Sequence, residues 1–323
     1  MKITTFNMCP SLMDEGYDSF SPKARKELFD GAKVSPFTDI PYSASDFVGN
    51  VKHVSISGMQ EKMFAVVDKN KLRLTYDGEQ SRYIIKPSPK SIALDNAEYM
   101  PINEHLTMQI ARQVYGINTA YNALMVMGDG RPAYIVRRFD VAPDGTKYRQ
   151  EDFASILGRT AENGSSYKYE GSYLEIGRAI MEIVPTWRFE LQKFFSIVIF
   201  NYLFANGDAH LKNFSLCTNP NGVFALSPAY DLLNTSIHLN DSEFAMSGGL
   251  GTNVCGKHPT SEDFALFGSE LGLTQKQIDK TLELFTQKQP LVEALCLRSL
   301  LSKKCKRMYL RSYGERLARL QKK

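Results

Sequence analysis

Hydrophobic and polar residues alternate in short runs between Lys52 and Phe139. A two-residue period is typical of strands with one buried face, and tight polar turns between the runs favour antiparallel pairing. One helix interrupts the runs, because hydrophobic residues recur every fourth position from Ile102 to Val114 before Gly116 ends the pattern. The expected strands cover residues 54–56, 63–67, 72–74, 83–85, 121–127 and 132–139, and the expected helix covers 96–116.

Longer amphipathic patterns follow the turn Pro143-Asp144-Gly145. They have the period of helices, and the one exception is a predicted hairpin with strands at 214–217 and 223–226 around the turn 219–222. The expected helices cover residues 173–184, 188–205, 261–271, 274–287, 290–301 and 302–320.

The change of pattern predicts an α+β protein with two lobes. Residues 51–140 are expected to form a strand-rich N-lobe and residues 141–323 a helical C-lobe. Residues 1–50 are rich in Pro, Ser, Asp and Phe, and contain one expected short helix at 22–29; we interpret them as an arm packed on the N-lobe. A cleft between the lobes is the simplest place for a polar site.

Composition narrows the class of protein. The chain has 323 residues, of which 43% are hydrophobic and 23% charged, which is typical of a globular protein with a sizeable core. A net charge of +4 is too small to indicate direct nucleic-acid binding. The stretch 298–323 is rich in Lys and Arg, which fits a solvated helix face. The alternative is a surface patch that binds RNA or an acidic partner. The five scattered cysteines form neither a disulfide framework nor a zinc motif. Without a signal-peptide pattern or a run of about 18 hydrophobic residues, we expect a cytoplasmic protein.

One polar loop carries the strongest candidate chemistry. A mostly hydrophobic run, 194–205, leads directly into Asn206-Gly207-Asp208, and Asn213 follows shortly afterwards. Asp231 comes just beyond the expected hairpin. An acid that can take a proton from a hydroxyl, followed by an amide and a second acid with hard oxygen atoms for Mg²⁺, indicates a phosphoryl-transfer site. Taken singly, these residues are ordinary turn formers.

The expected sheet contributes two weaker candidates. Small residues in the turn 55–62 would let backbone N–H groups approach phosphates, although a plain hairpin turn has the same composition. Lys86 ends a hydrophobic strand and could bind phosphate as a point charge, although a lysine there is more often simply exposed. Glu104 lies off the hydrophobic stripe of its helix, so it either faces solvent or holds Lys86 in place.

These motifs together resemble the HipA family of bacterial Ser/Thr kinases, the toxins of toxin–antitoxin systems. The resemblance extends from about residue 50 to 235. The matching stretches, in family order, are Ser55 to Lys62, Ile84-Ile85-Lys86-Pro87, Asn103-Glu104-His105, Val136 to Asp140, Gln150-Glu151-Asp152-Phe153, Asp208 to Asn213 and Pro228-Ala229-Tyr230-Asp231.

The resemblance implies a kinase-like fold related to lipid kinases, with ATP and Mg²⁺ as cofactors. It implies that Asp208 is the catalytic base, with His210 ordering the catalytic loop or serving only the structure. It further implies that Lys86 binds phosphate and that Asn213 and Asp231 bind Mg²⁺. The implied nucleotide-binding residues are Ser57, Gly58, Met59, Gln60, Glu61 and Lys62 in the turn, Lys86, the hinge residues Arg137 and Phe139, and Tyr230.

The resemblance also implies regulation. Ser55 and Ser57 lie in the nucleotide loop, and autophosphorylation there would place negative charge beside the phosphates of ATP and switch the kinase off. The alternative is that these hydroxyl groups only make hydrogen bonds within the turn.

The family pattern is not matched everywhere. Arg137 stands where some members have an acidic hinge residue. Well-known members carry an additional N-terminal module, which we do not expect in this chain. We therefore expect the chain to be most similar to the short HipT-type members, in which the missing module is encoded as a separate small protein.

The expected partner is a helix-turn-helix antitoxin, and such a separate small protein is a second candidate partner. The substrate that the resemblance implies is a translation-related protein, with an aminoacyl-tRNA synthetase as one candidate. Two other functions stay open at this point: an antitoxin-binding component with little catalysis, and a small-molecule or lipid kinase.

Overall fold

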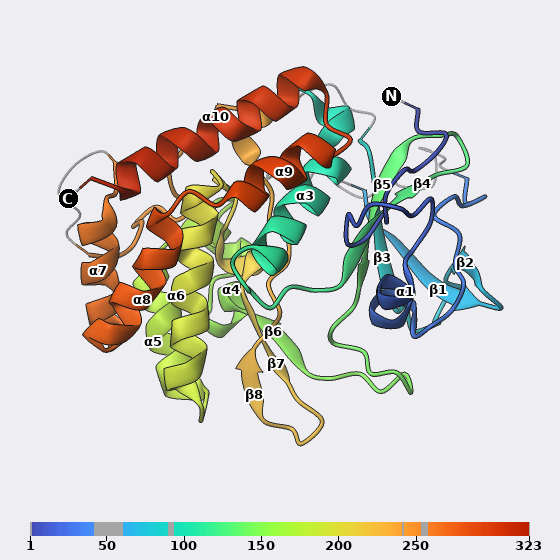
Figure 1. Ribbon diagram of the computed structural model, residues 1–323. Coiled ribbons are helices and arrows are strands. Elements are labelled where there is room, and N and C mark those ends of the chain that lie inside the picture. The colour runs from blue at the N-terminus through green and yellow to red at the C-terminus, as the bar shows by residue number, and fades with distance from the viewer. Residues whose placement is uncertain (1, 42–60, 90–93, 241, 253–257, 323) are drawn as a thin grey trace.

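The computed structural model describes residues 2–41, 61–89, 94–240, 242–252 and 258–322. A twisted sheet with the N-terminal arm lies at one end of the molecule, and a group of helices forms the other end (Figure 1). The described residues include no helix whose length and hydrophobicity would suit a membrane crossing.

The sheet of the first part has five strands in the order β2-β1-β3-β5-β4, and all neighbours are antiparallel. Alternate side chains face opposite sides. Helix α3 (Met100–Gln113) packs with one face, and the arm helix α1 (Pro22–Phe29) packs with the other. The strands are β1 (Met63–Asp68), β2 (Lys71–Leu74), β3 (Tyr83–Pro87), β4 (Asn122–Val126) and β5 (Pro132–Arg137).

The second part is mostly helical, with a small antiparallel sheet of order β6-β7-β8. The helices are α4 (Phe153–Ile156), α5 (Tyr173–Ile183), α6 (Trp187–Leu203), α7 (Ser261–Glu270), α8 (Gln275–Thr286), α9 (Pro290–Arg298) and α10 (Lys303–Leu320). The strands are β6 (Gln150–Asp152), β7 (Ser215–Thr218) and β8 (Phe224–Leu226). Short 3₁₀ helices occur at η2 (Ala97–Tyr99), η3 (Ala161–Asn163), η4 (Tyr167–Tyr169), η5 (Leu211–Asn213) and η6 (Thr235–Ile237).

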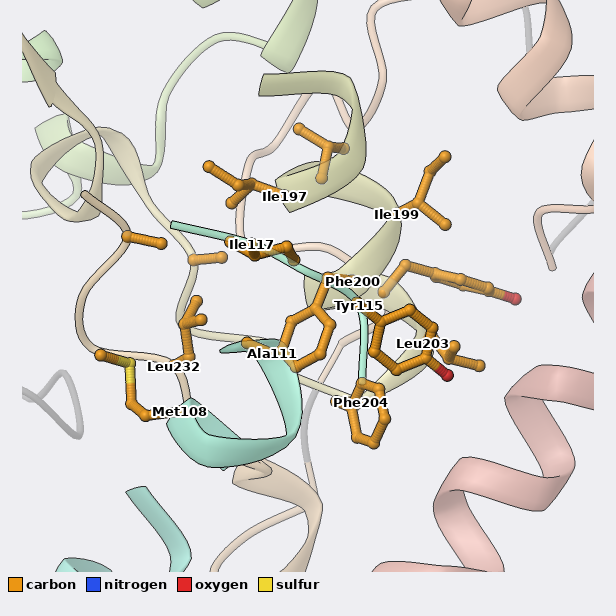
Figure 2. Packing of buried hydrophobic residues seen from close by; sticks show 14 of the residues in the cluster. Met108, Ala111, Tyr115, Ile117, Ile197, Ile199, Phe200, Leu203, Phe204 and Leu232 are labelled. Carbon is orange, nitrogen blue, oxygen red and sulfur yellow. The ribbon is translucent and has the colours of Figure 1, made fainter. Parts of the chain in front are cut away.

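Aromatic packing joins α3 to the helical part. Tyr115, just after α3, lies against Phe200 and Phe204 at the end of α6 (Figure 2). Its ring also stacks on Phe285 of α8, with ring centroids 4.6 Å apart. Phe200 and Phe204 stack on each other at 4.4 Å. Because α6 leads directly into residues 206–213, this buried core fixes where the polar loop begins.

Most expected elements are confirmed, with bounds shifted by a few residues at most positions and without a shift at α1. The helix expected at 96–116 is shorter, since η2 precedes it and Pro101 stands in its first turn. Sequence analysis missed β6 and α4, because three polar residues and a single helical turn show no periodicity. The strand expected at 54–56 lies outside the described residues, and the lobe bounds stay predictions.

Candidate functional site

The polar loop after α6 is held against the segment that follows Asp231. Gly207 N donates to Thr235 Oγ1 at 2.9 Å, and Thr235 N donates to Ala205 O at 3.0 Å. Asn206 adds a weaker bond from Nδ2 to Asp231 O at 3.3 Å. These bonds bring the two acidic segments together, although 23 positions separate Asp208 from Asp231 in the printed sequence.

Asp208 and Asn213 are joined within one turn of chain. Asn213 Nδ2 donates to the backbone oxygen of Asp208 at 2.7 Å, and the 3₁₀ helix η5 shapes the turn between them. Both residues are buried. Because the amide nitrogen is used by the backbone, the amide oxygen is the atom of Asn213 suited to a cation.

Lys86 joins the sheet to both neighbouring segments. Its Nζ lies 2.7 Å from Glu104 Oε1 of α3 and also contacts Asp231 Oδ1. The Lys86 and Glu104 side chains are buried, the Asp231 side chain is 13% exposed, and the Tyr134 ring lies 5.4 Å from Nζ. The interpretation of Glu104 as the partner of Lys86 is therefore the one that agrees with the contacts, and solvent exposure of Glu104 does not occur.

The charges in this cluster shift each other's ionisation. Burial opposes charge on Asp231, but Lys86 and Lys62 together outweigh it and lower its pKa to about 2. Burial raises the pKa of Glu104 to about 7, with Lys86 acting in the opposite direction. Burial likewise opposes charge on Lys86, yet Asp231 and Glu104 hold its pKa above the usual value. Asp231 is therefore ionised at neutral pH and Lys86 is protonated.

Asp231 also has an uncommon backbone conformation. Its φ of 53° lies in the left-handed region, which residues with a Cβ seldom adopt. Such conformations persist where the surrounding structure enforces them, and they gather at functional sites. The hydrogen bonds of the 205–207 segment to Asp231 and Thr235 supply that constraint.

His210 is buried and uncharged. Burial, with a contribution from Lys168, lowers its pKa to about 3. Within the described chain neither ring nitrogen has a hydrogen-bond partner, and Nε2 lies 3.9 Å from Asp208 Oδ1. A neutral ring at that distance forms no ion pair, so the visible contribution of His210 is its packing against Tyr169, with ring centroids 5.1 Å apart.

The expected nucleotide-binding residues are only partly described. Ser55, Ser57, Gly58, Met59 and Gln60 lie outside the described residues. Glu61 Oε2 is buried, and no hydrogen-bond partner for it occurs among the described residues. Lys62 is close enough to lower the pKa of both Asp231 and Glu104.

The two hinge residues point in different directions. The ring of Phe139 packs with that of Tyr230 at 5.6 Å, beside Asp231. Arg137 instead lies on the face of the arm helix, where its Nη1 is 2.8 Å from Asp30 Oδ1 and donates to Glu27 O at 3.0 Å. At Arg137, only the backbone is therefore available to the site.

Sequence analysis assigned no role to Tyr169 or to Lys212. Tyr169 Oη donates to Asp208 Oδ1 at 2.8 Å, and Lys212 Nζ lies 3.2 Å from Asp152 Oδ2. A tyrosine in a polar loop 39 positions before Asp208 gives no sequence signal for this contact. Asp152 lies in a stretch with family resemblance but had no assigned role.

The donor set suits Mg²⁺. The described residues contain no cluster of three or more His, Cys, Asp or Glu side chains able to hold a metal ion. The amide oxygen of Asn213 and the ionised carboxylate of Asp231 are hard oxygen donors, and two protein ligands suffice where nucleotide phosphates and water complete the shell. These two oxygen donors are therefore of the kind that suits a hard cation such as Mg²⁺ better than a soft metal ion.

Comparison with known proteins places these residues in a family context. The model of the HipA-like C-terminal domain matches residues 54–291. A Haemophilus influenzae protein named "Putative kinase" is 24% identical over 96% of this chain and 95% of its own length. "Putative kinase Y4dM" of Sinorhizobium fredii is 31% identical over 61% of this chain, which spans 48% of that relative.

Two solved structures show the same fold. HipA of Shewanella oneidensis, in a toxin–antitoxin complex with HipB and operator DNA, has a TM-score of 0.65 and 21% identity, with 86% of this chain and 66% of that chain covered. The Helicobacter pylori proinflammatory kinase CtkA has a TM-score of 0.51 and 14% identity, with 80% and 94% covered. The predicted α+β, two-lobed kinase-like fold, strand-rich in its N-lobe and helical in its C-lobe, is confirmed.

Proposed function

Because this chain belongs to the HipA-like C-terminal domain family, we propose that it is an ATP- and Mg²⁺-dependent Ser/Thr protein kinase. One observation carries the proposal. Lys86 forms a buried ion pair with Glu104 and contacts Asp231, on a segment hydrogen-bonded to the loop of Asp208. Kinases of this kind need a phosphate-binding lysine held by a glutamate, together with an acid–amide–acid set. The relatives named as kinases support the same conclusion.

Each residue has a distinct role in this proposal. Lys86 binds the nucleotide phosphates as a point charge, and Glu104 keeps its ammonium group in place. Asn213 and Asp231 supply oxygen ligands to Mg²⁺, which neutralises charge on the phosphates when it is bound. Asp208 accepts the proton of the attacking hydroxyl.

Fewer side chains are available to contact the adenine base than to contact the phosphates and Mg²⁺. Phe139 and Tyr230 offer an aromatic pair beside Asp231, whereas the Arg137 side chain is committed to Asp30 and the arm. We therefore assign adenine recognition to the hinge backbone and to this aromatic pair. In this proposal, adenine recognition does not depend on the side chain at position 137.

The decisive experiment is phosphate incorporation from γ-labelled ATP with Mg²⁺. Wild-type protein is expected to incorporate label, and Asp208→Asn is expected to lose it by about 10²-fold or more, because the base is removed while the shape is kept. Asp77→Asn, at an exposed turn residue, is the matched control and should behave as wild type. An equal rate in Asp208→Asn, or no incorporation by wild-type protein of unphosphorylated mass, would contradict the proposal.

Autophosphorylation belongs to the same proposal. Mass spectrometry of the labelled protein is expected to place phosphate on Ser55 or Ser57, two hydroxyls in the expected nucleotide loop. Phosphate found only elsewhere would leave the kinase proposal standing but remove this form of regulation.

The biological setting is also a proposal. The Shewanella oneidensis structure contains HipA with HipB and operator DNA, and we propose a helix-turn-helix antitoxin as a partner of this chain too, as the toxin of such a system. A separate small protein and a translation-related substrate remain expectations. Co-purification from the native host with an unrelated bait as control tests the partners.

A further inference from the structure

Tyr169 makes a contact that the proposed function does not use. It ends the 3₁₀ helix η4, in the segment between α4 and α5, and its hydroxyl donates to Asp208 Oδ1 at 2.8 Å. Resting on the proposed function, we propose that Tyr169 is a positioning residue that orients the carboxylate of Asp208 toward the acceptor hydroxyl. The hydrogen bond holds one carboxylate oxygen, Oδ1, and thereby restricts the orientation of the whole carboxylate.

The chemistry of the phenol suits this role. A terminal carboxylate rotates in a broad torsional well, so an additional hydrogen bond restricts its orientation. The ordinary pKa of a phenol is about 10, far above that of a carboxylic acid, so the proton stays on Tyr169 and does not use up the base. Asp208 thereby keeps its capacity to accept the substrate proton.

Tyr169 is itself held from two sides. Its ring meets the ring of His210 edge to face at 5.1 Å, and its backbone oxygen accepts from Ser247 N at 2.8 Å. The pairing continues along the segment, because Gly248 N donates to Gly171 O at 2.8 Å. The hydroxyl therefore belongs to a supported structure, not to a freely rotating surface side chain.

The glycines at 248 and 251 explain how the two segments approach so closely. A Cβ on Gly248 would lie 2.9 Å from Gly171 O, and one on Gly251 would lie 2.6 Å from Ser172 Oγ. Sequence analysis had no role for this glycine cluster. In the structure it allows the 246–251 segment to pair with the 169–174 segment that carries Tyr169.

Tyr169→Phe tests the inference, because it removes the hydroxyl and keeps the ring that packs on His210. We measure the rate constant of phosphate incorporation at saturating ATP and the dissociation constant of ATP by calorimetry. The rate constant is expected to fall about tenfold, less than on loss of the base itself, and the dissociation constant to stay within about twofold. Tyr76→Phe, at an exposed tyrosine in the loop after β2, is the control.

The outcomes separate the possible roles. An unchanged rate constant in Tyr169→Phe overturns the inference, and a faster rate overturns it as well, because it would mean that Tyr169 occupies the acceptor position and blocks it. A loss of ATP affinity or melting temperature in place of the rate effect would show a merely structural residue. Wild-type protein of unphosphorylated mass that incorporates no phosphate overturns the proposed function and this inference together. An active wild type with an unaffected variant overturns the inference alone.

Discussion

At the residue scale, Lys86 dominates the site. One ammonium group lies against two carboxyl groups, Glu104 and Asp231, in a place from which water is largely excluded. Buried charges of this kind are unfavourable unless they are paired, and removing one partner typically costs about 3–5 kcal/mol. The cluster is therefore better explained by function than by stability, since a hydrophobic replacement of the whole group would be easier to bury.

A second buried group, His105, makes the protein sensitive to acid. Burial lowers the pKa of His105 to about 4, and its Nε2–H donates to Ser11 O at 2.8 Å. The unfolded histidine has a pKa near 6.5, so between pH 6.5 and 4 the unfolded state binds a proton that the native state does not. The native state therefore loses up to about 3 kcal/mol of stability as the pH falls through that window.

His105→Gln isolates this effect, because the glutamine amide can also donate to Ser11 O but does not titrate. The free energy of unfolding is measured in urea from pH 7.5 to 4 for both proteins. The free energy of unfolding of wild type, relative to that of His105→Gln, should fall as the pH falls, because only wild type has a buried imidazole that resists protonation. Glu104, whose raised pKa acts in the opposite sense, is common to both and cancels. A difference that does not change with pH would contradict this account.

At the element scale, two helical glycines show how packing overrides helix propensity. A Cβ on Gly177 in α5 would lie 2.1 Å from Leu271 Cδ2, a fully buried methyl group. A Cβ on Gly314 in α10 would meet nothing within 4 Å. The helical backbone is the same at both places, but the neighbouring element decides whether a methyl group fits.

Alanine substitutions at these two positions should therefore change the stability of the protein in opposite directions. Gly314→Ala is expected to stabilise by about 0.5–1 kcal/mol, the gain in helix propensity. Gly177→Ala is expected to destabilise by about 1–3 kcal/mol, because Leu271 must move within a packed core. Denaturant unfolding of the two variants beside wild type measures both. Stabilisation by both alanines would show that α5 has room to adjust.

At the scale of the whole molecule, the site joins the sheet to the helical part. Lys86 comes from β3, Glu104 from α3, and Asp231 from the segment after β8. A nucleotide that replaces these mutual contacts with its own should therefore stabilise the whole fold and not one part of it.

Thermal unfolding tests this coupling. ATP with Mg²⁺ at about 100 times its dissociation constant should add about 2.7 kcal/mol of stability, seen as a higher melting temperature. Removing Mg²⁺ with EDTA, or removing one oxygen ligand in Asn213→Ala, should lose most of that increment. Asn221→Ala, in the exposed turn between β7 and β8, serves as the matched control. Equal stabilisation with and without Mg²⁺ would argue against the metal site.

The elements were predictable because their signals are local. Strand alternation, the four-residue period of α3 and the turn at 219–222 each depend on neighbouring residues, and the spacing of Asp208 and Asn213 fits one turn of chain closed by a hydrogen bond. Sequence by itself therefore determined the order of the elements and the candidate acids.

Contacts between distant segments were decided only by the tertiary structure. Whether Glu104 faces solvent or Lys86 depends on how α3 packs on the sheet, and the direction of Arg137 depends on the arm helix behind it. The contact of Tyr169 with Asp208 requires the 169–174 segment to be paired with the glycines after β8. Each of these outcomes depends on burial and pairing across long sequence separations, which no local pattern of residues can encode.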